Sequence, residues 1–238
     1  MIIVYGMASP NVSKITMMLY ELDVPFEFRW VDVFGGAQFD PAFLAMNPNN
    51  KVPVFIDESG PGGEPLTLFE SGAIMIYLAE KFDALLPPAG SAARYEVLKW
   101  LMLQKTGYGP MCGQYTHFSR FAPDGNEYAL ERYKREVLRI SGVYEKRLAE
   151  SQWIGGTEYS IADIALFPWI VRHEARGLSW DGFVHLPRWL QDVSARPAAQ
   201  AMLAHVDRLI ESDGPRQMAA TPEMIDVFTG RRPFQPAR

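Results

Sequence analysis

The pattern of apolar and polar positions in the first part of the chain alternates between the period of a strand and that of a helix. Residues 2–5 are β-branched or aromatic, and a Gly/Ser/Pro turn separates them from apolar positions at helical spacing in residues 12–22. From Pro25 apolar and polar residues alternate, which indicates a half-buried strand that ends near Val33. This part therefore predicts a strand–helix–strand unit.

The following segment combines short apolar runs with turn and cap signals. Asp40-Pro41 predicts a helix start, because aspartate caps a first turn and proline suits the first helical position. Two apolar runs, 52–56 and 66–68, flank a Gly/Pro-rich turn and predict a hairpin, after which Ser71 opens an apolar helix. The resulting order, β-α-β-α-β-β-α, resembles the thioredoxin-like plan.

A linker and a change of pattern follow. Residues 84–90 contain two prolines and a glycine, and beyond them helical periodicity dominates up to about residue 210, with an interruption near 107–110. Ser160 and Asp163 form a capping-box pattern at one helix start. We therefore predict an α/β plus all-α protein with a thioredoxin-like domain at 1–83, a linker at 84–90, an all-helical domain at 91–211 and a weakly periodic tail at 212–238.

Charge and hydropathy indicate which kinds of binding partner the protein lacks. The net charge is −5 and no basic run exceeds two residues, so the electrostatic footprint of a nucleic-acid-binding protein is absent. No segment approaches the run of about 18 apolar residues that a membrane span needs, and the start shows no basic leader with an apolar stretch behind it. We therefore expect a cytoplasmic protein with neither nucleic acid nor membrane as a partner.

The single cysteine, Cys112, limits the thiol chemistry of the chain. One cysteine excludes an internal disulfide, a CxxC redox pair and a cysteine-based zinc site, and we expect it to be a small buried residue. The histidines show no metal-ligand spacing, so no metal site is predicted; they are His117, His173, His185 and His205. Any thiol chemistry must therefore use a sulfur from outside the chain.

Two blocks carry a resemblance to a known family. Residues 47–53 (NPNNKVP) and 68–74 (LFESGAI) resemble the glutathione site of the glutathione transferase superfamily. The resemblance implies that Lys51, Val52 and Pro53 take part in glutathione binding. The bond before the proline would be cis, and the backbone of Val52 would pair with the cysteinyl part of glutathione.

Glu70 and Ser71 also suit the glutathione site on physical grounds that do not depend on this resemblance. A helix that starts at Ser71 offers free amides and a positive dipole end, which attract the γ-glutamyl carboxylate. Glu70 supplies the negative charge that the α-amino group needs. An ordinary acidic residue beside a serine cap is the purely structural alternative.

The first turn supplies the candidate catalytic residues. The superfamily places a tyrosine, serine or cysteine after the first strand, and here Ser9 and Asn11 stand in that place. A free thiol with a pKa of about 8.5 is only slightly ionised at neutral pH. One hydrogen bond to the thiolate, worth about 1.5 to 3 kcal/mol, lowers that pKa by about one to two units. The same residues also suit a turn that caps the following helix, and both roles are compatible.

Further residues resemble the Nu-class of the superfamily, a group that includes bacterial disulfide-bond reductases and is similar to the yeast nitrogen regulator. The resemblance implies that Gln38 contacts glutathione and that Arg132 reaches across a homodimer interface to a carboxylate in the partner's site, which suits an arginine fork. A surface ion pair with Glu131 or Glu136 is the alternative for Arg132. In this class a threonine commonly stands where this chain has Ser9, which keeps the hydroxyl. The matching pieces include residues 9–11, 35–39, 48–51, 109–111 and 131–133.

These observations favour glutathione-dependent thiol–disulfide exchange. Glutathione, reduced or as its disulfide, would be the co-substrate, and a small-molecule disulfide would be the second substrate. Two alternatives stay open. The same thiolate can attack an electrophilic small molecule, as in a conjugating transferase, with His117 and Phe118 lining an outer pocket. A glutathione-binding regulatory protein with little turnover is the other alternative.

Overall fold

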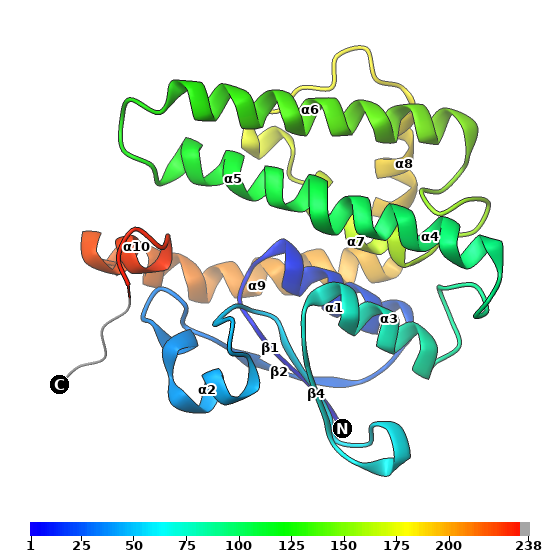
Figure 1. The fold of residues 1–238 in the computed structure, drawn as a ribbon, viewed down its shortest axis with the longest axis horizontal. Coiled ribbons are helices and arrows are strands. Elements are labelled where there is room, and N and C mark those ends of the chain that lie inside the picture. Colours follow the sequence, from blue (N-terminus) through cyan, green and yellow to red (C-terminus); the bar gives the residue numbers. More distant parts are fainter. Residues whose placement is uncertain (234–238) are drawn as a thin grey trace. The chain divides into compact units, whose positions relative to one another are not determined.

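The computed structural model describes residues 1–233, and the chain forms two compact units. The first unit combines Met1–Ile74 with the chain from Ala201 onward, and the second spans Met75–Gln200. The first contains a mixed sheet with helices and the second is helical, which confirms the predicted fold class (Figure 1). Residues 234–238 of the predicted tail lie outside the described residues.

The sheet of the first unit has four strands in the order β2-β1-β3-β4. β1 pairs with β2 in parallel and with β3 antiparallel, and β3 pairs with β4 antiparallel. The elements are β1 (Ile2–Gly6), α1 (Pro10–Glu21), β2 (Phe26–Trp30), α2 (Pro41–Met46), β3 (Val54–Asp57), β4 (Leu66–Phe69) and α3 (Ser71–Lys81). The predicted order is therefore confirmed, although β2 ends at Trp30 rather than near Val33.

Burial explains why these segments adopt their elements. Residues 2–4 of β1 are all buried, as expected for a strand covered on both faces. α1 starts where Ser9 accepts a hydrogen bond from the Val12 amide. Val12, Ile15 and Leu19 recur at helical spacing and are at most 1% exposed, so they form the face that packs into the core.

The C-terminal segment is part of the first unit. α9 (Pro197–Ala219) continues beyond residue 210, where the periodicity predicts its end, and α10 (Pro222–Phe228) follows. Phe228 of α10 packs on Phe34 with ring centroids 4.7 Å apart. Gly214 and Pro215 weaken the helical pattern in the sequence, and tertiary contacts override that local preference.

The second unit begins within α3 and is helical. A π-helical stretch at Leu103–Tyr108 joins α4 (Ala92–Met102) to α5 (Gly109–Arg120), close to the interruption predicted at 107–110. None of the helices within residues 1–233 is long and apolar enough to cross a bilayer. After α5 come α6 (Glu127–Glu150), α7 (Ile161–Ile170) and α8 (His185–Ser194).

A buried carboxylate holds the start of α7. Asp163 accepts hydrogen bonds from the Ile154 amide at 2.8 Å, the Ser160 amide at 3.0 Å and the Trp189 indole at 2.8 Å. Ser160 and Asp163 form the predicted capping box. Burial raises the pKa of Asp163, and the hydrogen bonds from these donors oppose that rise. One side chain thus connects a loop, a helix start and α8.

We expect Asp163→Ala to lower the free energy of unfolding by about 3 kcal/mol or more, because three buried donors lose their acceptor at about 1 to 3 kcal/mol each. Denaturant unfolding followed by circular dichroism measures this loss. Asp181→Ala removes an exposed carboxylate and should stay within about 0.5 kcal/mol of wild type. A loss below about 1 kcal/mol for Asp163→Ala would contradict the assigned role.

Candidate active site

The strand register brings the loops that carry the predicted site residues to one end of the sheet. Tyr5 of β1 pairs with Val54 of β3, which in turn pairs with Phe69 of β4. On the other side of β1, Gly6 pairs with Trp30, the last residue of β2. The carboxyl ends of β1, β2 and β4 therefore lie beside the amino end of β3. The turn into α1, the loop after β2, the segment before β3 and the start of α3 all leave the sheet there.

The turn after β1 presents a hydroxyl and an amide at the start of α1. Ser9 is half-buried, and its Oγ accepts the cap bond from the Val12 amide at 3.3 Å. A hydroxyl also has a proton to donate, so the cap is compatible with a second bond to a ligand. Asn11 is half-buried too, and its Oδ1 accepts a hydrogen bond from Lys14 Nζ at 2.9 Å. This bond uses the oxygen of the Asn11 amide, which is its acceptor; the Nδ2 group is the donor that a ligand could use.

Lys14 is a buried lysine beside Asn11 that the sequence pattern does not predict. It is 1% exposed, although lysine is almost never fully buried without partners. A lysine three residues after Asn11 shares its face of the helix, and this spacing is the one available signal. The local sequence does not predict this burial, because a lysine near a helix start is unfavourable to the helix dipole and is usually exposed.

A buried asparagine shapes the segment before β3. Asn47 is 2% exposed; its Nδ2 donates to the Lys51 carbonyl at 2.6 Å, and its Oδ1 accepts from the Asn49 amide at 2.9 Å. The Val52–Pro53 bond that follows is cis, as the family resemblance implies. Lys51 is exposed and Pro53 is buried, and Val52 lies just before the residues that pair in the sheet.

The junction between β4 and α3 has an unusual backbone conformation. Glu70 has a φ of 70°, a region that residues other than glycine adopt seldom and at a cost of about 1 kcal/mol or more. Its carbonyl accepts a hydrogen bond from the Ile74 amide at 3.0 Å, and its side chain is exposed. Ser71 is 2% exposed at the first position of α3. The amides and dipole of this helix start suit a carboxylate.

Gln38 lies in a short 3-10 turn, Ala37–Phe39, after β2. Its side chain is 5% exposed, and within residues 1–233 its Oε1 has no hydrogen-bond partner. Buried polar atoms are nearly always bonded, so this oxygen is suited to a donor from a ligand. Gln38 therefore offers a buried acceptor, in the loop after β2, that a bound peptide could use.

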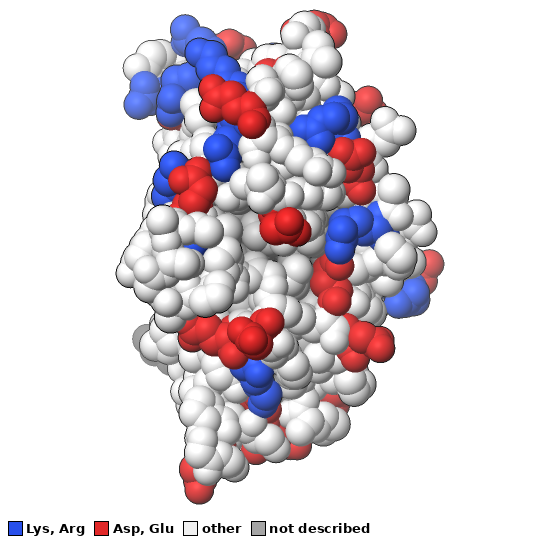
Figure 2. All heavy atoms as spheres, turned by 90° about the vertical axis from the view of Figure 1, so that its right-hand side faces the viewer, with Lys and Arg blue, Asp and Glu red and all other residues white. Residues whose placement is uncertain are grey.

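Arg132 belongs to the second unit, where it is exposed on α6. Within the described residues, the neighbouring Glu136 forms its ion pair with Arg139, at 2.7 Å. On the face drawn in Figure 2, several basic side chains gather at the upper left, and basic and acidic side chains are mixed over the rest. No three His, Cys, Asp or Glu side chains within residues 1–233 converge in a way that could hold a metal ion.

Cys112 is fully buried in α5 of the second unit. Burial raises the pKa of its thiol to about 12, so the reactive thiolate is scarcely present at neutral pH. The same helix carries His117 and Phe118, whose rings pack edge to face with centroids 5.1 Å apart. The cysteine is therefore a packing residue rather than a nucleophile.

Comparison with known proteins identifies the family. Residues 4–88 match the family model of the glutathione S-transferase N-terminal domain, and residues 108–197 match that of the C-terminal domain. Disulfide-bond oxidoreductase YfcG of Escherichia coli is 43% identical over 205 residues, which make up 85% of this chain and 95% of that protein. The chain belongs to the glutathione S-transferase family.

Solved structures of the glutathione S-transferase family share the fold. A family member from Pseudomonas fluorescens, crystallised with two glutathione bound, superposes with a TM-score of 0.79 at 44% identity, over 85% of this chain and 92% of that one. A glutathione transferase from Pseudomonas putida, with one glutathione disulfide bound per subunit, gives 0.78 at 40% identity, over 85% and 90%. The match to the C-terminal family model ends at residue 197, so α10 and most of α9 of this glutathione S-transferase lie beyond this family match.

We expect Cys112 of this glutathione S-transferase to resist alkylation in the native state, because a thiol with a pKa of about 12 is almost wholly protonated at pH 8 and is also buried. Treatment with iodoacetamide at about pH 8, followed by mass spectrometry, measures the labelled fraction. The urea-unfolded protein is the positive control and should label readily. Fast labelling of the native protein would contradict the assignment.

Proposed function

We propose that this family member catalyses glutathione-dependent thiol–disulfide exchange, as an oxidoreductase of the disulfide-bond reductase type. The observation that carries the proposal is the pair of donors at the start of α1, Ser9 Oγ and Asn11 Nδ2, in a chain whose one cysteine is buried and has a raised pKa. The likeness to a disulfide-bond oxidoreductase of Escherichia coli supports the activity. The glutathione and glutathione disulfide bound to the two Pseudomonas proteins support the co-substrate.

The junction of β4 and α3 binds the γ-glutamyl end of glutathione. The carboxylate lies against the first amides of α3 at Ser71, where the helix dipole favours negative charge. Glu70 faces the α-amino group with its carboxylate. The backbone of Val52, which precedes the sheet ladder, pairs with the cysteinyl residue as an added strand does.

The other end of the tripeptide lies by the loop after β2. Gln38 Oε1, buried and without a partner among the described residues, accepts a hydrogen bond from an N–H of glutathione. Lys51 is exposed beside Val52 and provides a positive charge for the glycyl carboxylate. Pro53 has no backbone N–H to donate, so the backbone pairing with glutathione ends at Val52.

Three side chains act on the glutathione sulfur. Ser9 and Asn11 donate hydrogen bonds to the thiolate, and Lys14 holds the Asn11 amide by its oxygen while adding a buried positive charge. A hydrogen bond to a charged group is worth about 1.5 to 3 kcal/mol, or about one to two pKa units. The positive end of α1 acts in the same direction. Together these terms make a large fraction of the bound thiol ionised at neutral pH.

The exchange transfers electrons from two glutathione molecules to one disulfide. The bound thiolate attacks one sulfur of a disulfide, a new S–S bond joins glutathione to that half, and the other half leaves as a thiolate that takes a proton from water. A second glutathione thiolate then attacks the mixed disulfide and releases the remaining half. Two glutathione molecules are oxidised and one disulfide is reduced, so the protein needs no redox-active cysteine.

We further propose a cytoplasmic homodimer of the Nu-class, in which Arg132 reaches a carboxylate in the partner's site. Arg132 is exposed on α6; Glu136, one helical turn further, pairs with Arg139 at 2.7 Å and also interacts electrostatically with Arg132. A planar guanidinium can meet a carboxylate at two points, which favours arginine for such a contact.

We expect Asn11→Ala to lower kcat/KM for reduction of bis(2-hydroxyethyl) disulfide by glutathione about 10- to 100-fold, because one hydrogen bond to the thiolate is lost. Gln200→Ala, which changes an exposed amide, is the control and should match wild type. Undiminished turnover of Asn11→Ala would reject the role of that amide. Turnover of an aryl halide but of no disulfide would favour conjugation, and glutathione binding without either activity would favour a regulatory protein.

Mixing of two inactive variants tests the dimer. Asn11→Ala and Arg132→Ala are each expected to be impaired, but a heterodimer of the two has one site with both residues intact. Random reassortment should therefore restore about a quarter of wild-type turnover, since half the dimers are mixed and each has one good site. Sedimentation checks that the protein is dimeric. A mixture with no more activity than the two separate variants would contradict a site formed by residues of both subunits.

A further inference from the structure

Asp213 connects the C-terminal helix to the turn that carries Ser9. It lies on α9, beyond the end of the family match, and is 7% exposed. Its Oδ2 accepts a hydrogen bond from the Ala8 amide at 2.7 Å, and its Oδ1 accepts one from Trp30 Nε1 at 2.7 Å. The two donors lie at the carboxyl ends of β1 and β2, where the proposed site is.

Both hydrogen bonds are short and charge-assisted, a type that is about twice as strong as a bond between neutral groups. Ala8 directly precedes Ser9, so its amide is not one of those that start α1. The peptide plane between Met7 and Ala8 is therefore fixed by a residue 205 positions away in the sequence. A shift of this plane would move the Ser9 and Asn11 donors together.

The same C-terminal segment also contacts the loop after β2. Arg216 Nε pairs with Asp32 Oδ2 at 3.1 Å, and Asp32 Oδ1 accepts a hydrogen bond from the Gly35 amide at 2.9 Å. Two polar side chains of α9 thus hold the loops that follow β1 and β2. Both loops carry residues of the proposed site.

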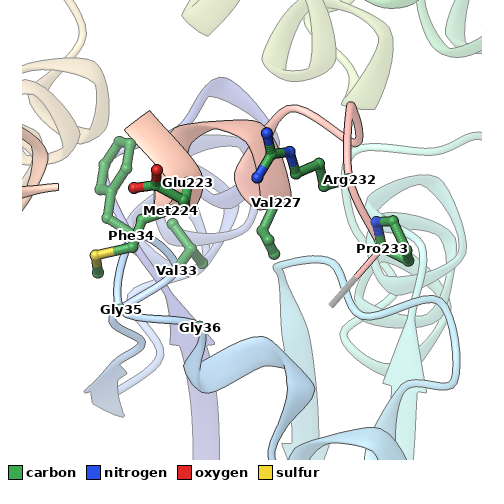
Figure 3. A pocket seen from close by; sticks show the side chains of 9 residues that line it. All are labelled: Val33, Phe34, Gly35, Gly36, Glu223, Met224, Val227, Arg232 and Pro233. Atoms are coloured by element: carbon green, nitrogen blue, oxygen red, sulfur yellow. The ribbon is translucent and has the colours of Figure 1, made fainter. Parts of the chain in front are cut away.

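Apolar packing and polar contacts both hold this segment in place. Ala220, Ile225 and Phe228 pack on the apolar cluster that includes Val33 and Phe34. A pocket of about 380 Å³ lies beside them, between α10 and the loop at Gly35 and Gly36, and Figure 3 shows its lining side chains. The hydrogen bonds of Asp213 add a directional constraint that apolar packing does not supply.

We propose that Asp213 is a positioning residue for the glutathione reaction, and that α9 beyond the family match is a built-in part of the site. The carboxylate holds the Ala8 amide and so sets the direction from which Ser9 and Asn11 meet the sulfur. This inference rests on the proposed function of that site. A negative charge by itself disfavours a thiolate, so the contribution of Asp213 is geometric.

Asp213→Asn gives the sharpest test, because a carboxylate offers two acceptor oxygens and an amide offers only one beside a donating NH₂. In this variant the NH₂ must face either the Ala8 amide or Trp30 Nε1, both of which are donors. We expect kcat for disulfide reduction to fall about tenfold or more, since small displacements of reacting groups cost up to about 100-fold. The KM for glutathione should stay within about twofold, because the binding contacts at α3 are untouched.

A second substitution should rescue the first. Trp30→Phe removes the competing donor, so the amide oxygen that Asp213→Asn introduces can accept the Ala8 amide while its NH₂ faces an aromatic ring. The double variant is expected to recover kcat to within about threefold of Trp30→Phe alone. Asp213→Ala should stay low with or without Trp30→Phe, because it has no acceptor. Glu211→Gln, exposed on the same helix, should match wild type.

Hydrogen exchange of the Ala8 amide gives a readout that does not depend on turnover. Exchange should be faster in Asp213→Asn and Asp213→Ala and return to normal in the rescued variant. The proposal is overturned if kcat of Asp213→Asn stays within about twofold of wild type, or if Trp30→Phe does not raise kcat in the double variant. It is also overturned if the fall in kcat equals the fall in the fraction of folded protein. A wild-type protein that reduces no disulfide overturns the proposed function instead, and Ala8 exchange alone then decides for or against the anchor.

Discussion

The register of the four-stranded sheet is the constraint on which the site depends. Tyr5 pairs with Val54 and Val54 with Phe69, so the turn after β1, the segment before β3 and the junction after β4 leave the sheet together. A slip of one residue would turn every side chain of a strand to the opposite face; in β4 it would expose the half-buried Leu66 and Leu68. Hydrophobic packing thereby fixes the place of polar groups that contribute little to the core themselves.

Two charges meet the turn after β1 from different elements. Lys14, on α1, bonds the Asn11 side chain, and Asp213, on α9, bonds the Ala8 backbone. In the proposed mechanism Lys14 favours a thiolate at this turn, whereas Asp213 restricts the backbone that presents the donors. In that mechanism the protein supplies charge, donors and geometry. Its own Cys112 is buried in the other unit, so the sulfur has to come from glutathione.

The sequence predicts those parts of the structure that local signals encode. The cap at Ser9 and the capping box at Asp163 are predictable because each acts on an amide within three residues. The order of strands and helices along the chain follows from the periodicity of apolar residues. Long-range contacts leave no such signal. The burial of Lys14, the acceptor role of Asp213 and the continuation of α9 past Gly214 depend on segments far apart in the chain, and their local preferences favour exposure or a tail. The proposed roles of Gln38 and Arg132 in ligand binding come from the family resemblance rather than from the pattern of apolar and polar residues.

The pKa of the bound glutathione thiol tests the central claim most directly. A thiolate absorbs ultraviolet light that a thiol does not, so the absorbance of the saturated protein against pH gives the ionisation of the bound sulfur. A site that donates hydrogen bonds to the sulfur predicts a pKa at least about one unit below the value of about 8.5 for a free thiol. A bound thiol that titrates at its free value would contradict the account.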